Sequence, residues 1–307
     1  MAAPAAAARG NEVLQFKDTE FRQNFPNQGF KIGHRLCDEA AFQLPRLVEL
    51  AKRLPENLVE YYSGGVSVGQ RNKGYPKTGL SVVETVRRIE ESGSWMVMKN
   101  VEVDAEYNGF LRTLLDEWYR EIDPRQRELL RGDCHREHAF LFISSPNSVT
   151  PYHLDDEHNF LLQIRGTKQV SMWDPNDREV VSEPEMESQL EFFHDANYER
   201  YLPYQETFQT RARVFELNPG EGLHFPFGAP HWVKNGSQVS ISFSITFRSG
   251  LSERLAKVYF VNKRLRRIGL TPTPPARSQW RDSLKSGAFQ AARRAGKLLR
   301  GSFANPD

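Results

Sequence analysis

The spacing of hydrophobic residues in the first part of the chain predicts both helices and strands. Residues 43–54 and 81–92 place apolar side chains three or four positions apart, a spacing typical of amphipathic helices, and residues 107–119 repeat it. Between these helices, the short apolar run 95–98 predicts a buried strand. Residues 26–138 are therefore expected to form a mixed α and β region that packs on the rest of the protein.

From residue 139 onward the pattern changes to short hydrophobic stretches separated by turn residues, which is typical of an all-β core. The most regular stretch, residues 239–247, alternates Val, Ile and Phe with Ser and Thr. This period of two predicts a strand with one buried face, formed by the hydrophobic residues. We expect the β core to cover residues 139–250, so the fold class is mainly β with flanking helices.

The carboxy-terminal region, residues 251–307, returns to helical spacing and is strongly basic. A proline-rich stretch at 271–276 predicts a linker, and residues 283–299 predict a basic amphipathic helix. Between residues 248 and 300, 14 Lys and Arg stand against two acidic residues, although the whole chain has a net charge of +2. We expect this region to form a homodimer, to contact RNA or another polyanion or an anionic membrane surface, or to remain a solvated tail.

The composition narrows the class of protein. The chain has 307 residues, 39% hydrophobic and 26% charged, as is ordinary for a soluble globular protein. No apolar run approaches the roughly 18 residues of a membrane span, and the alanine-rich start lacks the pattern of a signal peptide, so residues 1–25 are predicted to be a disordered tail. Cys37 and Cys134 lie in no Cys/His cluster, which favours a reducing, cytoplasmic location.

The first candidate for chemistry is the pair His153 and Asp155, separated by one residue. In an extended segment two such side chains point to the same side, so an imidazole and a carboxylate could bind one metal ion. A histidine and an aspartate at this spacing also occur by chance, and the pair alone does not distinguish a metal site from an unrelated surface or core histidine.

Lys168 is the second candidate. A tight turn through Arg165 and Gly166 is expected to return the chain as a hairpin and to bring Lys168 beside the histidine and aspartate. Lys168 shares a strand face with Val170 and Met172, so its ammonium is either buried or held in solvent at the strand end. A buried ammonium requires an anionic partner, which a dicarboxylate cosubstrate would supply.

A third metal ligand is expected at His231, which follows a turn rich in Gly and Pro and opens a strand. Two histidines and one carboxylate on one side of an iron leave other positions open, whereas structural zinc sites close with four ligands. His224 could replace His231, although a structural role is preferred for it. His158 is considered for the entrance of the site, and the remaining histidines are expected to be structural or solvent-facing: His34, His135, His138 and His194.

Three motifs together resemble one protein family. They are T-P-x-H-x-D from Thr150, N-F-x-x-Q-I-x-G-x-K from Asn159 to Lys168, and P-G-x-x-L-x-x-P before His231. Residues 139–248 are similar to the JmjC/cupin-like iron(II)- and 2-oxoglutarate-dependent oxygenases, especially the asparaginyl hydroxylase that inhibits hypoxia-inducible factor. The resemblance implies a double-stranded β-helix core, also described as a cupin-like jelly roll.

The resemblance also implies roles for individual residues. Iron(II) would be bound by His153, Asp155 and His231, which are then both the metal-ligating and the catalytic residues. Lys168 and Thr150 would hold the distal carboxylate of the cosubstrate 2-oxoglutarate, and Asn159 would lie near it, with O2 as the oxidant. The final strand departs from the family pattern, because Ser244 and Thr246 stand where the similar hydroxylase has an Asn and a Trp.

The function expected from this resemblance is hydroxylation of an unactivated C–H bond in a protein or peptide side chain or in a small molecule. Demethylation of an N-methyl lysine by the JmjC type of reaction is an alternative within the enzymes. A non-catalytic, cupin-like protein that binds a ligand or regulates a partner is an alternative outside them. The substrate itself is not identified by the sequence.

Overall fold

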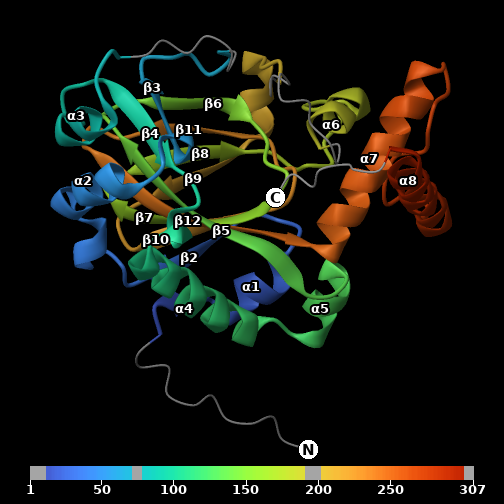
Figure 1. The fold of residues 1–307 in the computed structure, drawn as a ribbon, viewed down its shortest axis with the longest axis horizontal. Coiled ribbons are helices and arrows are strands. Elements are labelled where there is room, and N and C mark those ends of the chain that lie inside the picture. Colours follow the sequence, from blue (N-terminus) through green and yellow to red (C-terminus); the bar gives the residue numbers. More distant parts are fainter. Residues whose placement is uncertain (1–11, 71–77, 191–201, 301–307) are drawn as a thin grey trace, which may run out of the picture.

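The structure, a computed structural model, describes residues 12–70, 78–190 and 202–300. Two antiparallel β-sheets pack against each other, with helices outside them (Figure 1). In spatial order, the smaller sheet consists of β6 (Val149–His153), β11 (His231–Asn235), β8 (Lys168–Met172) and β9 (Arg213–Leu217). The larger sheet consists of β1 (Leu14–Gln15), β2 (Phe30–His34), β10 (Glu221–Phe225), β7 (His158–Arg165), β12 (Ser240–Ser249), β5 (Cys134–Ser144), β4 (Ser94–Met98) and β3 (Val59–Ser63).

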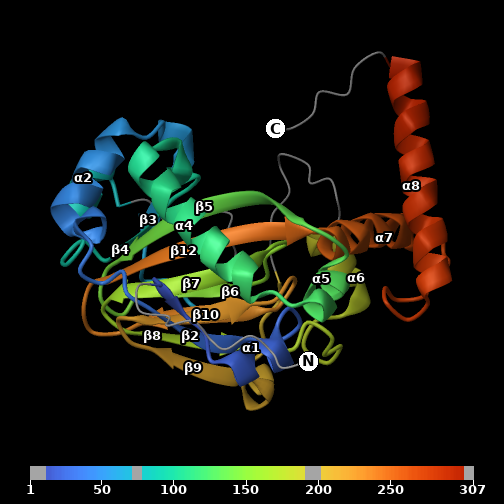
Figure 2. The ribbon, with the colours of Figure 1, turned by 90° about the horizontal axis from the view of Figure 1, so that it is seen from below.

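Helices cover the outer face and the ends of the larger sheet, whereas α6 (Glu183–Gln189) packs with residues of the smaller sheet. Figure 2 shows α4 (Ala105–Glu121) running across this face. The other α-helices are α1 (Asp18–Asn24), α2 (Leu44–Arg53), α3 (Val82–Arg87), α5 (Pro124–Leu130), α7 (Gly250–Arg267) and α8 (Gln279–Arg300). Short 3-10 helices span Ala40–Phe42 (η1), Glu56–Leu58 (η2), Val101–Val103 (η3) and Glu206–Arg211 (η4). The expected fold class, mainly β with flanking helices, is confirmed.

Strand β12 shows how the core forms. Its hydrophobic residues, such as Phe243 and Phe247, pack in one cluster with side chains of α4, including Trp118. Its Ser and Thr residues face the smaller sheet and are buried as well: Ser240, Ser242 and Ser244 are 0% exposed. The expectation of a single buried face was therefore wrong, because the second sheet covers the polar side of the strand.

The amino-terminal boundary also needs correction. Residues 1–25 were expected to be a disordered tail, and residues 1–11 lie outside the described part of the chain. Residues 14–15, however, pair with β2, and α1 buries Phe21 against the core. Phe25 is equally buried and stacks on Phe21 with ring centroids 5.1 Å apart. These aromatic side chains hold the segment on the core, because burying their large apolar surface stabilises the folded segment.

Residues 26–138 do more than pack on the β core. Strands β2, β3 and β4 are hydrogen-bonded members of the larger sheet, and β4 pairs directly with β5. Strand β5 itself begins at Cys134, five residues before the expected boundary at 139. At the other end, α7 begins at Gly250, one residue before the expected start of the helical region at 251.

The expected hairpin between residues 159 and 173 does not form. Strand β7 belongs to the larger sheet and β8 to the smaller one, and they are not neighbours in either. The turn at Arg165 and Gly166 therefore carries the chain from one sheet to the other. Gly166 has φ +69°, and a Cβ there would lie 2.5 Å from the carbonyl oxygen of Val239, so the crossing requires a glycine.

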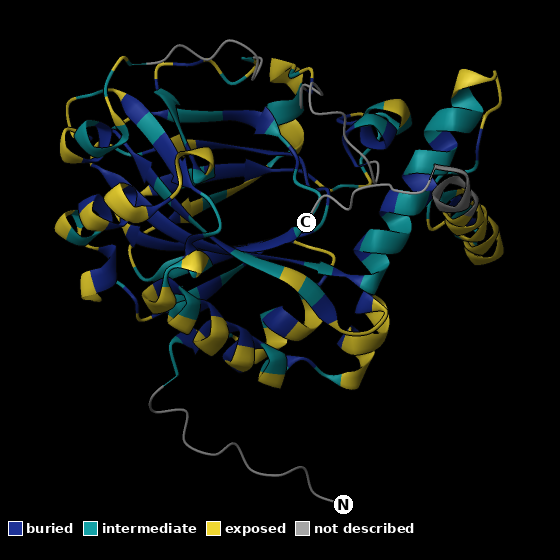
Figure 3. Ribbon diagram, in the orientation of Figure 1, coloured by how far each residue is buried: buried dark blue, intermediate teal, exposed yellow. Residues whose placement is uncertain are grey.

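The carboxy-terminal helices α7 and α8 project away from the two sheets (Figures 1 and 2). Phe289 of α8 is buried against Phe260 of α7, with ring centroids 4.9 Å apart. Outward-facing residues of α8 are exposed (Figure 3), and Trp280 and Leu284 are each 63% exposed. No helix formed by the described residues is long and hydrophobic enough to cross a membrane.

Candidate metal centre

Three side chains meet at one end of the space between the sheets. His153 is the last residue of β6, His231 is the first residue of β11, and the two are register partners. Asp155 follows β6 by two residues. Its carboxylate oxygens lie 3.9 Å from Nε2 of His153 and 3.8 Å from Nε2 of His231. These distances are too long for hydrogen bonds, but the atoms are close enough to bind one metal ion.

The backbone fixes which nitrogen of each histidine is available. Nδ1 of His153 lies 2.7 Å from the carbonyl oxygen of Pro151, and Nδ1 of His231 lies 2.9 Å from that of Ala229. A carbonyl oxygen only accepts hydrogen bonds, so each Nδ1 carries the proton and donates it. Both Nε2 atoms therefore present lone pairs toward Asp155, as metal ligation requires.

Burial keeps His231 in this neutral form. Its side chain is 6% exposed, and burial together with the adjacent His153 ring lowers the pKa of His231 to about 4. His153 and Asp155 are half-buried, with side chains 32% and 35% exposed. The cluster thus has one deeply buried imidazole and an open side from which a ligand can approach.

A bulge in β6 places Thr150 and His153 on the same face. His231 is opposite His153, but Val233 is opposite Thr150, so β6 has one extra residue in this interval. Strand neighbours three positions apart normally face opposite sides, and the extra residue restores a common side. Val233 packs in the interior cluster between the sheets, and Thr150 therefore faces the interior as His153 does.

His224 lies on the other face of the larger sheet. Its ring centroid is 5.1 Å from those of Phe25 and Phe30, and its Nδ1 donates to the carbonyl oxygen of Gln28 at 2.9 Å. Burial lowers the pKa of His224 to about 3. The structure thus brings His231, and not His224, to Asp155.

His158 is not at the entrance of the cluster. It is buried on the same outer face as His224, and its ring stacks on Phe247 with centroids 5.2 Å apart. Among the other histidines, His34 is also buried, whereas His135 and His138 are paired with Glu253 and Glu102 on the flank of β5. His194 lies outside the described residues.

Lys168 reaches the interior despite the missing hairpin. It is 5% exposed, and burial lowers the pKa of its ammonium to about 7. Nζ lies 2.5 Å from Oγ of Ser242, to which it donates, and 5.7 Å from the centroid of the Phe142 ring. Within residues 12–70, 78–190 and 202–300, Lys168 forms no ion pair with a carboxylate.

Lys168 and the three-residue cluster occupy opposite ends of the same interior. Along β8 the register partner of His231 is Met172, four residues from Lys168 and therefore about 13 Å along the strand. Asn159 of β7 lies at the cluster end, because its register partner is Phe225, whose ring is 4.7 Å from that of His231. The side-chain Oδ1 of Asn159 accepts a hydrogen bond from the hydroxyl of Ser244.

Sequence reasoning missed the polar residues that line this interior from β12 and β7. Ser242 donates to Oε1 of Gln163 at 2.7 Å, and Nε2 of Gln163 donates to Ser240 at 3.0 Å. The signal was the alternation of serines in residues 239–247. It was visible, but it was interpreted as a solvent-exposed face.

The comparison with known proteins agrees with this architecture. A model of the cupin-like domain matches residues 69–252, more than half of the chain. The chain belongs to the cupin-like domain family. The X-ray structure of E. coli ycfD is similar in fold, with a TM-score of 0.51 and 14% sequence identity over 93% of this chain and 70% of that one.

Two curated relatives of this cupin-like chain are JmjC proteins of Dictyostelium discoideum. JmjC domain-containing protein D is 33% identical over 108 residues, which is 34% of this chain and 23% of the relative. JmjC domain-containing protein F is 27% identical over 125 residues, 35% of this chain and 26% of the relative. The matches thus span about a quarter of the relatives' length, and the resemblance to the JmjC/cupin-like family is confirmed.

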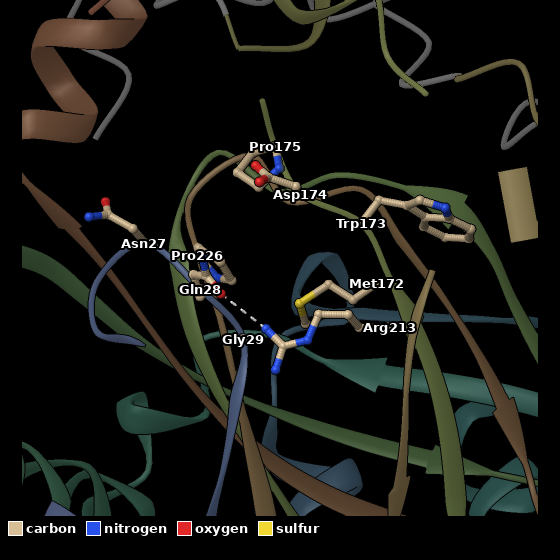
Figure 4. A pocket seen from close by; sticks show the side chains of 9 residues that line it. All are labelled: Asn27, Gln28, Gly29, Met172, Trp173, Asp174, Pro175, Arg213 and Pro226. Carbon is tan, nitrogen blue, oxygen red and sulfur yellow. Dashed lines mark hydrogen bonds between the residues drawn. The ribbon is translucent and has the colours of Figure 1, made fainter. Parts of the chain in front are cut away.

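A pocket of about 70 Å³ is lined by residues that include Gln28, Met172 and Arg213 (Figure 4). Met172, the register partner of His231, forms part of its wall. Arg213 donates to the side chain of Gln28 across it at 3.2 Å, and Asp174 lies on its edge.

Proposed function

We propose that the protein is an iron(II)- and 2-oxoglutarate-dependent oxygenase that hydroxylates an unactivated C–H bond of a protein or peptide side chain or of a small molecule. The observation that carries the proposal is the convergence of Nε2 of His153 and Nε2 of His231 on Asp155, in a chain of the cupin-like family. Two imidazoles and one carboxylate suit iron(II), with positions left open for cosubstrate and dioxygen.

Lys168 supports the cosubstrate assignment. Leaving an ammonium in the interior without a carboxylate is costly, and an anionic ligand would offset that cost. The distal carboxylate of 2-oxoglutarate would supply the charge, while its 2-oxo acid end reaches the metal. Thr150 faces the same interior and would donate to this carboxylate, and Asn159 would contact the cosubstrate near the metal. A non-catalytic cupin-like protein has no need of such a buried cation.

The residues of this chain contribute positioning and electrostatics. His153 and His231 keep their protons on Nδ1, bonded to backbone carbonyls, and hold Nε2 for the metal. Asp155 offsets positive charge at the half-open side, and hydrophobic residues such as Leu161 and Leu223 exclude water from the interior. Bound iron and 2-oxoglutarate would supply the oxidation itself, in which dioxygen converts the C–H bond to C–OH and 2-oxoglutarate to succinate and carbon dioxide.

The direct test measures succinate. Protein purified without metal, then given iron(II), 2-oxoglutarate and dioxygen, should form succinate slowly even without substrate, and the Asp155→Ala variant should not. The His224→Ala variant, changed on the other face of the sheet, is the matched control and should form succinate as the wild type does. Absence of succinate with metal bound would refute the oxygenase proposal. With candidate substrates, addition of one oxygen atom indicates hydroxylation, and release of formaldehyde indicates N-demethylation.

A further inference from the structure

A chain of buried hydrogen bonds, called the relay below, connects the turn at Gly166 to Lys168. It runs from the backbone carbonyl of Arg165 through the side chains of Gln163 and Ser242 to Nζ of Lys168. Nε2 of Gln163 lies 2.7 Å from the carbonyl oxygen of Arg165 and 3.0 Å from Oγ of Ser240. Both Gln163 and Ser242 are 0% exposed, so water does not compete for these groups. The relay thus runs from backbone, through an amide and a hydroxyl, to the ammonium.

The direction of each hydrogen bond in the relay follows from the one before it. A carbonyl oxygen accepts only, so the Arg165 carbonyl orients the NH2 group of Gln163 toward itself, and Oε1 is left facing Ser242. The single proton of the Ser242 hydroxyl is then donated to Oε1 at 2.7 Å. Its lone pairs consequently face Nζ of Lys168, which donates to them at 2.5 Å.

The relay leaves Lys168 with two free donors. An ammonium has three N–H groups, and within the described part of the chain Nζ of Lys168 donates one of them, to Ser242. Holding the long lysine stem in one conformation in advance removes part of the entropy cost of ligand binding.

We propose that Ser242 and Gln163 are positioning residues, which hold Lys168 so that its two remaining N–H groups bind the distal carboxylate of the cosubstrate. They thereby set the preference of the site for a dicarboxylate over a monocarboxylate 2-oxo acid. This inference rests on the proposed function, because it requires 2-oxoglutarate to be the ligand.

The experiment compares two ligands that share the metal-chelating 2-oxo acid end. Full-length protein loaded with Mn(II) is titrated calorimetrically with 2-oxoglutarate and with 2-oxobutyrate, which lacks the second carboxylate. Ser242→Ala should weaken 2-oxoglutarate binding about tenfold, equivalent to ~1.4 kcal/mol, and leave 2-oxobutyrate binding unchanged. Gln163→Met should act in the same direction, since it releases the Ser242 hydroxyl to reorient. Ser242→Thr, which keeps the hydroxyl, should restore the preference.

Ser171→Ala is the matched control. Ser171 is a fully buried serine of the same strand as Lys168, but its hydroxyl accepts from Gln209 and belongs to no part of the relay. Equal weakening of both ligands in Ser242→Ala and in Ser171→Ala would indicate a packing effect and overturn the inference. An unchanged preference in both Ser242→Ala and Gln163→Met would overturn it as well. If the wild type binds neither 2-oxo acid, the proposed function fails first.

Discussion

The protonation of Lys168 should make cosubstrate affinity depend on pH. Burial lowers the pKa of this ammonium from 10.5 to about 7, and at 1.36 kcal/mol for each pH unit the ligand-free site disfavours the charged form by roughly 5 kcal/mol. Binding a carboxylate beside Nζ favours the charged form again. The protein should therefore take up one proton at Lys168 when 2-oxoglutarate binds above about pH 7.

The direction of the effect follows from the two states. Below about pH 7, Lys168 is charged in both the free and the bound protein, and affinity does not change through this group. Above it, the free protein is neutral at Lys168 and the complex is charged, so the dissociation constant should rise about tenfold for each pH unit. Between pH 7 and pH 9 the loss should approach a hundredfold. No charged partner of Lys168 among the described residues offsets this change.

The assay is calorimetry on the Mn(II)-loaded protein, with 2-oxobutyrate as reference ligand. The ratio of the two dissociation constants cancels the pH dependence of the metal and isolates the distal carboxylate. Titration in two buffers of different ionisation enthalpy counts the protons taken up. Lys168→Met should give a ratio independent of pH. A constant ratio from pH 6.5 to pH 9 in the wild type would refute the reasoning, because the ammonium would then be charged throughout.

Three further outcomes are expected. Metal analysis should find one iron(II) per wild-type chain and full occupancy in the control variant His224→Ala. Stable iron binding should be lost in each of the ligand variants His153→Ala, Asp155→Ala and His231→Ala. Full occupancy in any one of these three would disprove that residue's assignment as a ligand. Gly166→Ala should lower the free energy of unfolding by at least ~2 kcal/mol, measured in urea, because φ is positive and a Cβ would meet the Val239 carbonyl. Removing residues 279–307 should preserve metal binding. If α8 forms a homodimer, the truncated protein should be a monomer by light scattering at any salt concentration. Loss of metal binding would mean that α8 stabilises the two-sheet core.

The sequence correctly predicted those helices and strands whose hydrophobic spacing matches the surfaces that they bury in the folded protein. The hydrophobic spacing at 43–54 and 107–119 predicted helices that the structure has as α2 and α4, because each buries one face in the same hydrophobic cluster. The same logic failed for β12. Alternation identifies two faces of a strand, but it does not say whether a second sheet covers the polar one. That covered face contains Ser242, and with it the relay to Lys168.

Long-range pairing was the other property that local pattern could not supply. Residues 159–173 have the sequence of a hairpin, yet β7 and β8 join different sheets. A two-sheet arrangement still brings Lys168 inside, because both sheets turn their inner faces to the same space. Lys168 is thus buried inside, but it lies at the opposite end of the interior from His153 and Asp155, not beside them as the expected hairpin would have placed it.

The bulge in β6 decides which side chains between Thr150 and His153 face the interior. Thr150 and His153 are three residues apart, and a regular strand would place them on opposite faces. The extra residue opposite Trp232 brings both to the interior and sends Tyr152 outward, where it packs with Trp173. The spacing in a regular strand would therefore have assigned Thr150 to the face opposite His153. The interior position of Thr150, the place of His153 in the candidate metal cluster and the outward packing of Tyr152 thus depend on one backbone feature.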